Sequence, residues 1–244
     1  MKKKIVSIII PGYNESHRVE STINSVECIM DSLGRQYEIL VVDDGSIDDT
    51  VAALEGMVSG KKHRRLRFVS YADGPSRREN LAKSFRLLKG DYVMLLDMDL
   101  SMDPAYIKDM IQWIEEGYDL VLGSRYHKDS KVKRHPTRFL VSKLYNATIR
   151  VLFNTGFKDN ICGFKAFRKD AILRLVGEAG IDKTGRRGVF WDTEIVIRAI
   201  WDKLKIKEIP ISWKEAKSSS LTFRREIKMV PYILKFWIRN VLKI

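Results

Sequence analysis

The first half of the chain alternates between short runs that are apolar throughout and longer segments whose apolar positions recur every three or four residues. Runs of the first kind predict buried β-strands, and they cover residues 5–10, 39–42, 66–69, 92–96 and 120–122. Segments of the second kind predict helices at residues 19–33, 48–58, 77–88 and 104–116. Strands without polar alternation occur in sheets that are covered on both faces, so the pattern predicts an α/β fold around a mostly parallel sheet.

The second half of the chain is less regular. A basic loop at residues 127–135 precedes the elements that we expect there, namely a helix at 137–153, a strand at 164–167, a helix at 191–204, a strand at 206–211 and a C-terminal helix. No internal repeat and no Pro-, Gly- or Ser-rich linker divides the sequence. We therefore expect one α/β domain over residues 1–220, followed by an amphipathic segment over residues 221–244.

Composition limits the class of protein and the kind of partner. The 244 residues are 45% hydrophobic, which is enough to build a core without disulfides or a structural metal. The two cysteines, Cys28 and Cys162, indicate a reducing compartment, and we expect a cytoplasmic protein. The apolar run at 5–10 stops at Pro11, shorter than a signal sequence, and no run approaches the ~18 apolar residues of a membrane span. The net charge of +13 predicts an anionic partner, which is nucleic acid, an acidic membrane surface or a phosphorylated substrate.

Three of the predicted strands end in acidic or turn-forming residues. These ends read Pro11-Gly12-Tyr13-Asn14-Glu15, Asp43-Asp44-Gly45-Ser46 and Asp97-Met98-Asp99. Ligands of open parallel sheets bind at the carboxyl ends of the strands, so we expect the acids to converge on one edge. Alternating carboxylates such as Asp97 and Asp99 suit Mg2+ or Mn2+, which take oxygen ligands together with substrate phosphates. A solvated loop is the alternative interpretation of a lone Asp pair.

Longer motifs around these ends match a known family. Ile-Ile-Pro-Gly-Tyr-Asn-Glu (9–15), Val-Val-Asp-Asp-Gly-Ser-x-Asp-x-Thr (41–50) and Gly-Asp-Tyr-x-x-x-Leu-Asp-x-Asp-Leu-Ser (90–101) closely resemble family 2 glycosyltransferases of the GT-A fold, a Rossmann-like fold of nucleotide-diphospho-sugar transferases. Gly-Ser-Arg-Tyr (123–126), Arg-x-x-x-Ser (138–142) and Asp-x-x-Cys-Gly-Phe-Lys (159–165) are similar to the polyprenyl-phosphate branch, the dolichyl-phosphate mannose synthases and glucosyltransferases. The resemblance covers residues 5 to 220. It implies a metal-dependent, inverting hexosyltransferase that moves mannose from GDP-mannose, or glucose from UDP-glucose, to dolichyl or polyprenyl phosphate.

The resemblance also assigns roles to individual residues. It places Pro11, Tyr13 and Glu15 along the nucleotide pocket, with Val42 and Asp44 at the base and ribose. It implies that the metal and the donor diphosphate are held by Asp97, Asp99, Ser101 and the backbone of Met98. The acceptor phosphate would be bound by Arg125, Arg138 and Ser142, and a further contact to the donor phosphates would come from Lys214 or Lys217. Asp99, Arg125 and Arg138 would act on the reacting groups.

Two expectations also follow from the chemistry of the side chains and of the acceptor that the resemblance implies. Arg138 and Ser142 are four residues apart on a predicted helix, so they share a face, and a guanidinium with a hydroxyl suits a phosphate. Solvated surface side chains are the alternative in so basic a region. A phosphate monoester is largely dianionic at neutral pH and attacks without a general base, so no residue is assigned as one. Asp192 and Glu194 are available on a predicted helix, and a structural role suits them equally well.

The chain departs from the family pattern in two segments. Where a Gly-x-Gly pattern is usual, it reads Ser76-Arg77-Arg78-Glu79-Asn80. Arg78 stands at a usual glycine position, so we expect a different local backbone there. Where Gly-Ser-Lys is usual, it reads Ser218-Ser219-Ser220, which is why the nearby lysines are considered for the donor phosphates.

The C-terminal segment has the pattern of a helix at a membrane surface. At 100° per residue its basic side chains fall on one face, namely Arg224, Lys228, Lys235, Arg239 and Lys243. Its apolar side chains fall on the other, namely Phe223, Val230, Leu234, Trp237, Val241 and Ile244. This pattern favours a peripheral protein on the cytosolic face of a membrane, with added attraction from the basic run at 128–134. Docking of the helix on the domain is the alternative.

The sequence leaves several partners open. The Asp-x-Asp-Leu-Ser motif favours mannose and the Asp-x-x-Cys-Gly-Phe-Lys motif favours glucose, so GDP-mannose and UDP-glucose are balanced as donors. A different sugar or a lipid-linked oligosaccharide acceptor is the alternative function. No zinc ligands, aromatic–basic pattern or recognition helix indicates specific nucleic-acid binding. A separate membrane subunit is compatible with the sequence.

Overall fold

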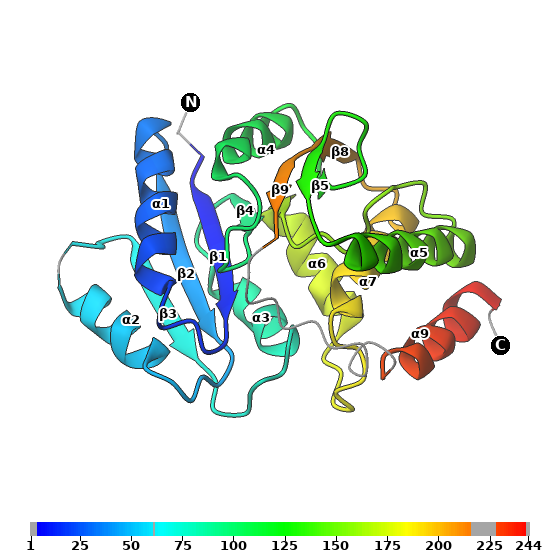
Figure 1. The fold of residues 1–244 in the computed structure, drawn as a ribbon, viewed down its shortest axis with the longest axis horizontal. Helices are drawn as coiled ribbons and strands as arrows, with labels where there is room; N and C mark the ends of the chain where they lie inside the picture. The colour runs from blue at the N-terminus through cyan, green and yellow to red at the C-terminus, as the bar shows by residue number, and fades with distance from the viewer. Residues whose placement is uncertain (1–3, 61, 216–227, 243–244) are drawn as a thin grey trace.

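The computed structural model describes residues 4–60, 62–215 and 228–242, and it contains a seven-stranded sheet flanked by helices (Figure 1). Parallel strands form the N-terminal half of this sheet in the order β3-β2-β1-β4, with bounds β1 (Val6–Gly12), β2 (Tyr37–Asp43), β3 (Leu66–Ser70) and β4 (Tyr92–Leu95). β2 is buried along its whole length because helices cover both faces of the sheet. The prediction of a mostly parallel α/β sheet is confirmed.

The C-terminal half of the sheet contains a reversed strand. β7 (Lys165–Arg168) lies between β4 and β5 (Leu120–Ser124) and is antiparallel to both, whereas β8 (Ile206–Pro210) is parallel to β5. A small parallel pair, β6 (Lys131–Lys133) and β9 (Ser212–Lys214), lies outside this sheet. The apolar runs predict neither the direction of β7 nor the small pair, because a short apolar run does not indicate which strands it pairs with.

Helices cover the sheet on both faces. α1 (Val19–Ser32), α2 (Thr50–Ser59) and α4 (Ile107–Glu115) pack on one face. The other face is covered by α3 (Glu79–Ser84), α6 (Lys169–Ala179) and α7 (Phe190–Trp201). α6 is an element that the sequence pattern did not predict, and α7 ends three residues before the predicted helix end at residue 204.

The helix predicted at residues 77–88 is shorter in the structure. Arg77 has a φ of 69°, in the left-handed region, and α3 begins only at Glu79. The backbone N–H of Arg77 donates to the carboxylate of Asp44 at 2.7 Å, a tertiary contact that holds the chain outside the helix. The predicted start was therefore wrong by two residues, because a long-range hydrogen bond overrides local helix preference.

Two further helices, α5 (Pro136–Phe153) and α9 (Val230–Trp237), belong to the C-terminal half (Figure 1). α9 continues as a π-helical turn, Ile238–Leu242. The ring of Phe236 in α9 lies 5.7 Å from the ring of Phe153 in α5 and 5.7 Å from that of Phe190 in α7, so α9 is docked on the domain. None of the helices within the described ranges is both long enough and apolar enough to cross a bilayer. The expected domain boundary after residue 220 lies outside the described residues.

Candidate active site

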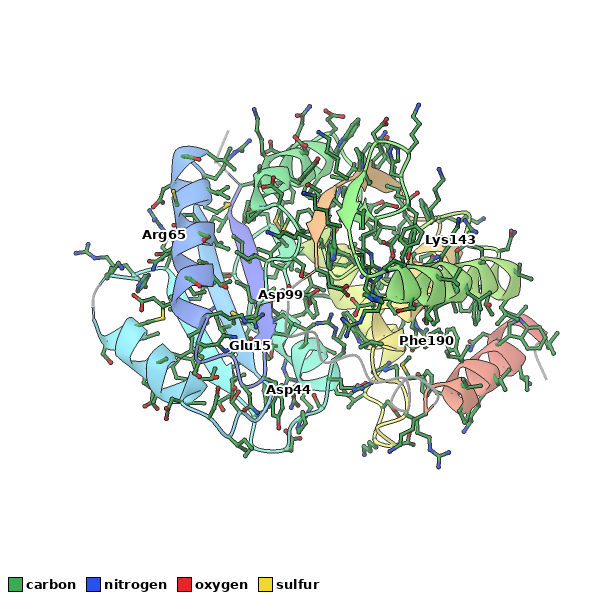
Figure 2. The ribbon with its side chains drawn as sticks, viewed as in Figure 1. Glu15, Asp44, Arg65, Asp99, Lys143 and Phe190 are labelled. Carbon is green, nitrogen blue, oxygen red and sulfur yellow. The ribbon has the colours of Figure 1, made fainter. Side chains whose placement is uncertain are left out.

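The loops that follow β1 and β2 are joined by hydrogen bonds between the two motifs. The backbone N–H of Asn14 donates to Ser46 Oγ at 2.8 Å, and its side chain accepts from the N–H of Ile47 at 2.8 Å. The N–H of Glu15 donates to Thr50 Oγ1 at 2.8 Å. Because β4 pairs with β1 on its other side, the loop after β4 reaches the same edge. The structure therefore brings the three predicted strand ends together (Figure 2).

Asp44 is held by the segment in which the sequence departs from the family pattern. Its carboxylate accepts hydrogen bonds from Ser76 Oγ at 2.7 Å, the Arg77 N–H at 2.7 Å and Asn80 Nδ2 at 2.8 Å. The close approach of this segment requires Gly74, since a Cβ there would lie 1.8 Å from the carbonyl oxygen of Asp44. The segment that differs from the family pattern thus packs directly on Asp44, which is predicted to contact the nucleotide.

The other residues predicted for the nucleotide pocket lie at the same edge in different environments. Pro11 pairs with Val42 in the β1–β2 ladder, and Val42 is fully buried. Tyr13 is exposed. Glu15 forms an ion pair with Arg18 at 2.9 Å. Burial raises the pKa of Glu15, and the ion pair only partly offsets this effect.

Asp97 follows β4 and is fixed from two sides. Arg78 Nη2 lies 3.1 Å from Asp97 Oδ1, while Arg78 Nε donates to Asp192 Oδ2 at 2.8 Å. On the other side, a Cβ at Gly163 would lie 2.1 Å from Asp97 Oδ2, so a larger residue at this position would displace the carboxylate of Asp97. Burial raises the pKa of Asp97; Arg78 opposes the rise, and the carboxylates of Asp99 and Asp192 add to it. Arg78, at a usual glycine position of the family, is thus the side chain that orients Asp97.

Asp192 and Glu194 of α7 are buried beside cations. Lys165 Nζ lies 2.9 Å from Asp192 Oδ1, and Arg78 occupies the other oxygen. Burial alone would raise the pKa of Asp192, but Arg78 and Lys165 hold it below its usual value. Glu194 accepts a hydrogen bond from Arg198 Nε at 2.9 Å. These contacts favour a positioning role over proton transfer for both carboxylates.

Asp99 is held within its own loop. Its carboxylate accepts from the Ser101 backbone N–H at 3.0 Å and from the Ser101 hydroxyl at 2.7 Å. The N–H of Lys214 in β9 donates to the Ser101 carbonyl at 2.7 Å, which places β9 beside this loop. The carbonyl of Met98 accepts from the hydroxyl of Thr22 at 2.7 Å. Asp99 therefore has a fixed backbone and lies in the same loop as Asp97.

The side chains of this loop fit a divalent cation that takes part of its ligands from phosphates. Asp97 and Asp99 offer carboxylate oxygens, and Ser101 offers a hydroxyl. Within the described parts of the chain, no group of three or more His, Cys, Asp or Glu side chains is placed to hold a metal. Mg2+ and Mn2+ commonly use one or two protein carboxylates and complete their shell with water and substrate phosphate, so this donor set suits them.

Arg125, at the end of β5, is buried in an ion pair. Its Nε and Nη2 atoms donate to Asp159 at 2.7 and 2.9 Å, and its backbone N–H donates to the same carboxylate at 3.0 Å. The guanidinium also lies 5.1 Å from the ring centroid of Trp213. Burial would lower the pKa of Arg125, but Asp159 raises it. Contact of Arg125 with the acceptor phosphate stays a prediction, and in this structure Asp159 occupies its guanidinium.

Arg138 and Ser142 belong to a polar cluster on the inner side of α5. Arg138 Nη1 donates to Glu215 Oε1 at 2.9 Å. Arg134 Nη1 donates to Ser142 Oγ at 2.9 Å, and the Ser142 hydroxyl also bonds the hydroxyl of Tyr126. The two residues paired by their spacing therefore lie in one site, which we call the α5 polar cluster: Tyr126, Arg134, Arg138, Ser142 and Glu215.

Sequence reasoning missed part of this cluster. Arg134 lies in a run of basic residues that is typical of a solvated loop, yet its side chain is only 7% exposed. Glu215 is brought to it by the β6–β9 pair, in which Lys133 lies opposite Lys214. No local signal predicts that pairing. The side chain of Lys214 is exposed, and Lys217 lies outside the described residues.

Comparison with known proteins places the chain among glycosyltransferases. Residues 7–175 match the model of glycosyl transferase family 2. Glycosyltransferase AglD of Haloferax volcanii is 29% identical over 236 residues, which are 95% of this chain and 37% of AglD, so this chain spans little more than a third of that relative. Dolichyl-phosphate beta-glucosyltransferase of Saccharomyces cerevisiae is 26% identical over 234 residues, 88% of this chain and 69% of the yeast protein.

Among solved structures, glucosyl-3-phosphoglycerate synthase from Mycobacterium tuberculosis in complex with Mn2+, UDP and glucosyl-3-phosphoglycerate superposes with a TM-score of 0.67 at 20% identity. The match covers 95% of this chain and 79% of that one. The sheet order, the clustered strand ends and a family match over more than half of the sequence agree: the chain has the GT-A fold and belongs to glycosyl transferase family 2.

Proposed function

We propose that the protein transfers a hexose from a nucleotide sugar to a polyprenyl phosphate such as dolichyl phosphate. The observation that carries this proposal is that α5 combines two features. Its inner side holds Arg138 and Ser142 in the α5 polar cluster. Its outer side exposes four apolar residues, Leu140, Val141, Leu144 and Val151. A phosphate attached to a long hydrocarbon chain is a ligand that matches both sides of one helix.

The acceptor side of the reaction follows from the chemistry of the α5 polar cluster. A phosphate monoester carries about −1.5 to −2 charges at neutral pH and three acceptor oxygens, which suit arginine N–H groups and a serine hydroxyl. Such an oxygen is nucleophilic without a general base, in keeping with the ion-paired state of Asp192 and Glu194. One direct displacement at the anomeric carbon inverts it. The cluster's task is to bind and orient the attacking oxygen.

The donor side of the reaction is the edge formed by the ends of β1, β2 and β4. Asp44 would lie at the base and ribose, and Asp97 and Asp99 at the diphosphate. These two aspartates, with Ser101, are the residues that would hold Mg2+ or Mn2+. A bound divalent cation would neutralise charge on the departing diphosphate. Arg78 keeps Asp97 oriented toward this edge, and the backbone of Lys214 in β9 bonds the loop that carries Asp99.

Among donors, UDP-glucose has more support than GDP-mannose. The yeast relative is named a dolichyl-phosphate beta-glucosyltransferase, and the mycobacterial synthase of the same fold was solved with UDP-glucose and Mn2+. GDP-mannose remains the alternative donor.

A membrane surface is the partner that the outer sides of α5 and α9 suit. Leu140 and Leu144 are 67% exposed and Val151 is 84% exposed. α9 and the turn after it expose Val230, Leu234, Ile238, Val241 and Leu242. Lys143, labelled in Figure 2, lies on α5 near this apolar row and would meet anionic headgroups. We place the protein at the cytosolic face, where nucleotide sugars are made available to it.

The outward face of α9 differs in part from the face expected from the sequence. Val230, Leu234 and Val241 are exposed, as an interfacial helix requires. Trp237 instead turns toward α5, where its Nε1–H donates to the carbonyl of Leu152 at 2.9 Å. The helix therefore uses apolar residues on both sides, one side for docking on the domain and the other for lipid.

The experiment that tests this function is transfer of radiolabelled sugar to a polyprenyl phosphate in detergent, with UDP-glucose and GDP-mannose compared. Reactions with Mn2+ and with EDTA run in parallel. Labelled lipid from one donor, lost in EDTA, is the expected result and identifies the sugar. No labelled lipid from either donor, with the protein folded and UDP or GDP still bound, would contradict the transfer of glucose or mannose to this acceptor, and it would favour another sugar or a lipid-linked oligosaccharide acceptor.

A further inference from the structure

The α5 polar cluster contains an anion of its own. The carboxylate of Glu215 accepts from Arg138 Nη1 at 2.9 Å and from the backbone N–H of His135 at 3.1 Å. Arg134 Nε lies 3.4 Å from the same carboxylate. Burial alone would raise the pKa of Glu215, but these donors hold it below its usual value, so the side chain is ionised at neutral pH.

We propose that Glu215 is an internal counter-anion of this cluster, whose contacts with Arg138 and Arg134 are taken over by the phosphate of the acceptor. This inference rests on the proposed function for the identity of the acceptor. It assigns to Glu215 a role in selecting phosphate-bearing acceptors, beyond the binding residues themselves.

Charge and hydrogen-bonding capacity explain why a phosphate ester replaces the carboxylate. Glu215 carries one negative charge and two oxygens, whereas a phosphate monoester carries up to two charges and three free oxygens. The additional oxygen can accept from Ser142, whose hydroxyl now bonds Arg134 and Tyr126. A neutral alcohol has no charge with which to displace Glu215. Glu215 therefore stays bound to the arginines when the acceptor is an alcohol, and it is displaced when the acceptor carries a phosphate.

A purely positioning role for Glu215 predicts the opposite effect of removing its charge. If the carboxylate only held Arg138 and Arg134 in place, its loss would loosen both arginines and weaken phosphate binding. If the carboxylate competes with the ligand, its loss strengthens phosphate binding. The sign of the change therefore decides between the two roles.

The test compares Glu215→Gln, which keeps the shape and removes the charge, with Glu215→Asp, which keeps the charge. Glu115→Gln is the matched control. Glu115 pairs with Arg35 at 2.6 and 2.7 Å and is not part of the α5 polar cluster, and its substitution changes the net charge equally. The first readout is binding of inorganic phosphate to the full chain, followed by 31P line broadening. UDP affinity and thermal unfolding report whether each variant is folded.

We expect Glu215→Gln to bind inorganic phosphate about three- to tenfold more tightly than the wild type, with Glu115→Gln unchanged. In the transfer assay its KM for polyprenyl phosphate should fall while kcat stays similar, and Glu215→Asp should resemble the wild type. Equal or weaker phosphate binding by a folded Glu215→Gln, or the same gain in Glu215→Asp, would overturn the inference.

The two readouts separate this inference from the proposed function. Wild-type protein that transfers sugar to polyprenyl phosphate, together with unchanged phosphate binding in Glu215→Gln, contradicts the counter-anion alone. A second outcome is tighter phosphate binding in Glu215→Gln together with no transfer to polyprenyl phosphate by the wild type. It contradicts polyprenyl phosphate as the acceptor and supports the counter-anion role of Glu215 toward a different phosphate-bearing acceptor. Neither pair of outcomes leaves the role of Glu215 undecided.

Discussion

The hydroxyl of Tyr232 in α9 donates a hydrogen bond of 2.9 Å to Oε2 of Glu194 in α7, a carboxylate that is completely buried. The same carboxylate lies 3.5 Å from Arg187 Nη1, and Arg187 in turn binds Glu79 at the start of α3. α3 follows directly on Arg78, which contacts Asp97. The C-terminal helix is therefore joined by polar contacts, as well as by packing, to the segment that supports the predicted donor site.

Replacing Tyr232 with Phe should destabilise the protein. The change leaves Glu194 with one donor fewer in a site without water access, and such a loss costs about 1–3 kcal/mol. Denaturant unfolding of the full chain measures the free energy of unfolding. Lys235→Ala, on the exposed side of α9, is the control and should change it little. Equal stability of Tyr232→Phe and the control would show that the Tyr232–Glu194 contact is not needed for α9 docking.

Asp99→Asn should weaken metal-dependent binding of the donor nucleotide without unfolding the protein. Asp99 is partly exposed, and its side-chain bonds stay within its own loop, so the fold does not depend on its charge. We expect affinity for Mn2+ to fall about 10- to 100-fold, the range seen even for residues that only support metal ligands. Mn2+ titration by electron paramagnetic resonance in the presence of UDP measures the effect. Unchanged Mn2+ affinity would remove Asp99 from the metal site.

Arg138→Ala should raise the KM for polyprenyl phosphate about 10-fold or more, because a charged hydrogen bond contributes about 1.5–3 kcal/mol. UDP affinity should stay at the wild-type value, since Arg138 lies on α5 and the proposed donor site lies at the ends of β1, β2 and β4. Arg174→Ala, which breaks a partly exposed pair with Asp202, is the matched control. Full activity of Arg138→Ala at limiting lipid would contradict the acceptor site.

Leu144→Glu should reduce binding to vesicles that contain anionic lipid. Leu144 is exposed, so the new charge costs the fold little and acts on the interface. Val58→Glu places the same charge on an exposed position of α2 in the other half of the domain, and vesicle binding should then change only slightly. Co-sedimentation with vesicles at low and high salt measures both variants. Equal binding of the two would mean that α5 does not face lipid.

Stability should fall with acidification because of the buried Asp159–Arg125 pair. Burial alone would raise the pKa of Asp159, but Arg125 lowers it below its usual value of 3.8. A carboxyl whose pKa is depressed by folding stabilises the protein at pH values above its pKa in the unfolded state. This contribution is lost as the pH falls through its pKa in the folded state. Thermal unfolding followed from pH 6 to below about 4 should show the loss in the acid range. A melting temperature independent of pH over this interval would contradict the ion pair.

The sequence predicted the convergence of the three strand ends well because the determinants there are local. Continuous apolar runs identified the parallel strands, and parallel strands bring their carboxyl ends to one edge whatever the loops contain. Asp44, Asp97 and Asp99 were therefore expected at the same edge before any contact was known. The spacing of Arg138 and Ser142 also predicted correctly that they share one face of a helix, because helical periodicity is a local property of the chain.

Contacts between distant segments could not be predicted in this way. Arg187 lies in a run of Lys, Thr, Gly and Arg that is typical of an exposed loop, yet its side chain is fully buried against Glu79, 108 residues away. Arg78 and Asp192 are 114 residues apart. Such pairs depend on which helices pack over the sheet, and a charged residue has the same local pattern whether its partner is water or a buried carboxylate.

An apolar row lies on the same helix as Arg138 and Ser142 of the α5 polar cluster, which is proposed to bind phosphate, and this placement would change the dimensionality of the proposed reaction. With the outer side of α5 resting on lipid, the acceptor reaches Arg138 and Ser142 by diffusing laterally within the bilayer. The rate then follows the surface density of polyprenyl phosphate, whereas the sugar nucleotide arrives from bulk solution. Diluting the acceptor with inert lipid would slow transfer, although the bulk concentrations of acceptor, sugar nucleotide and protein stayed the same.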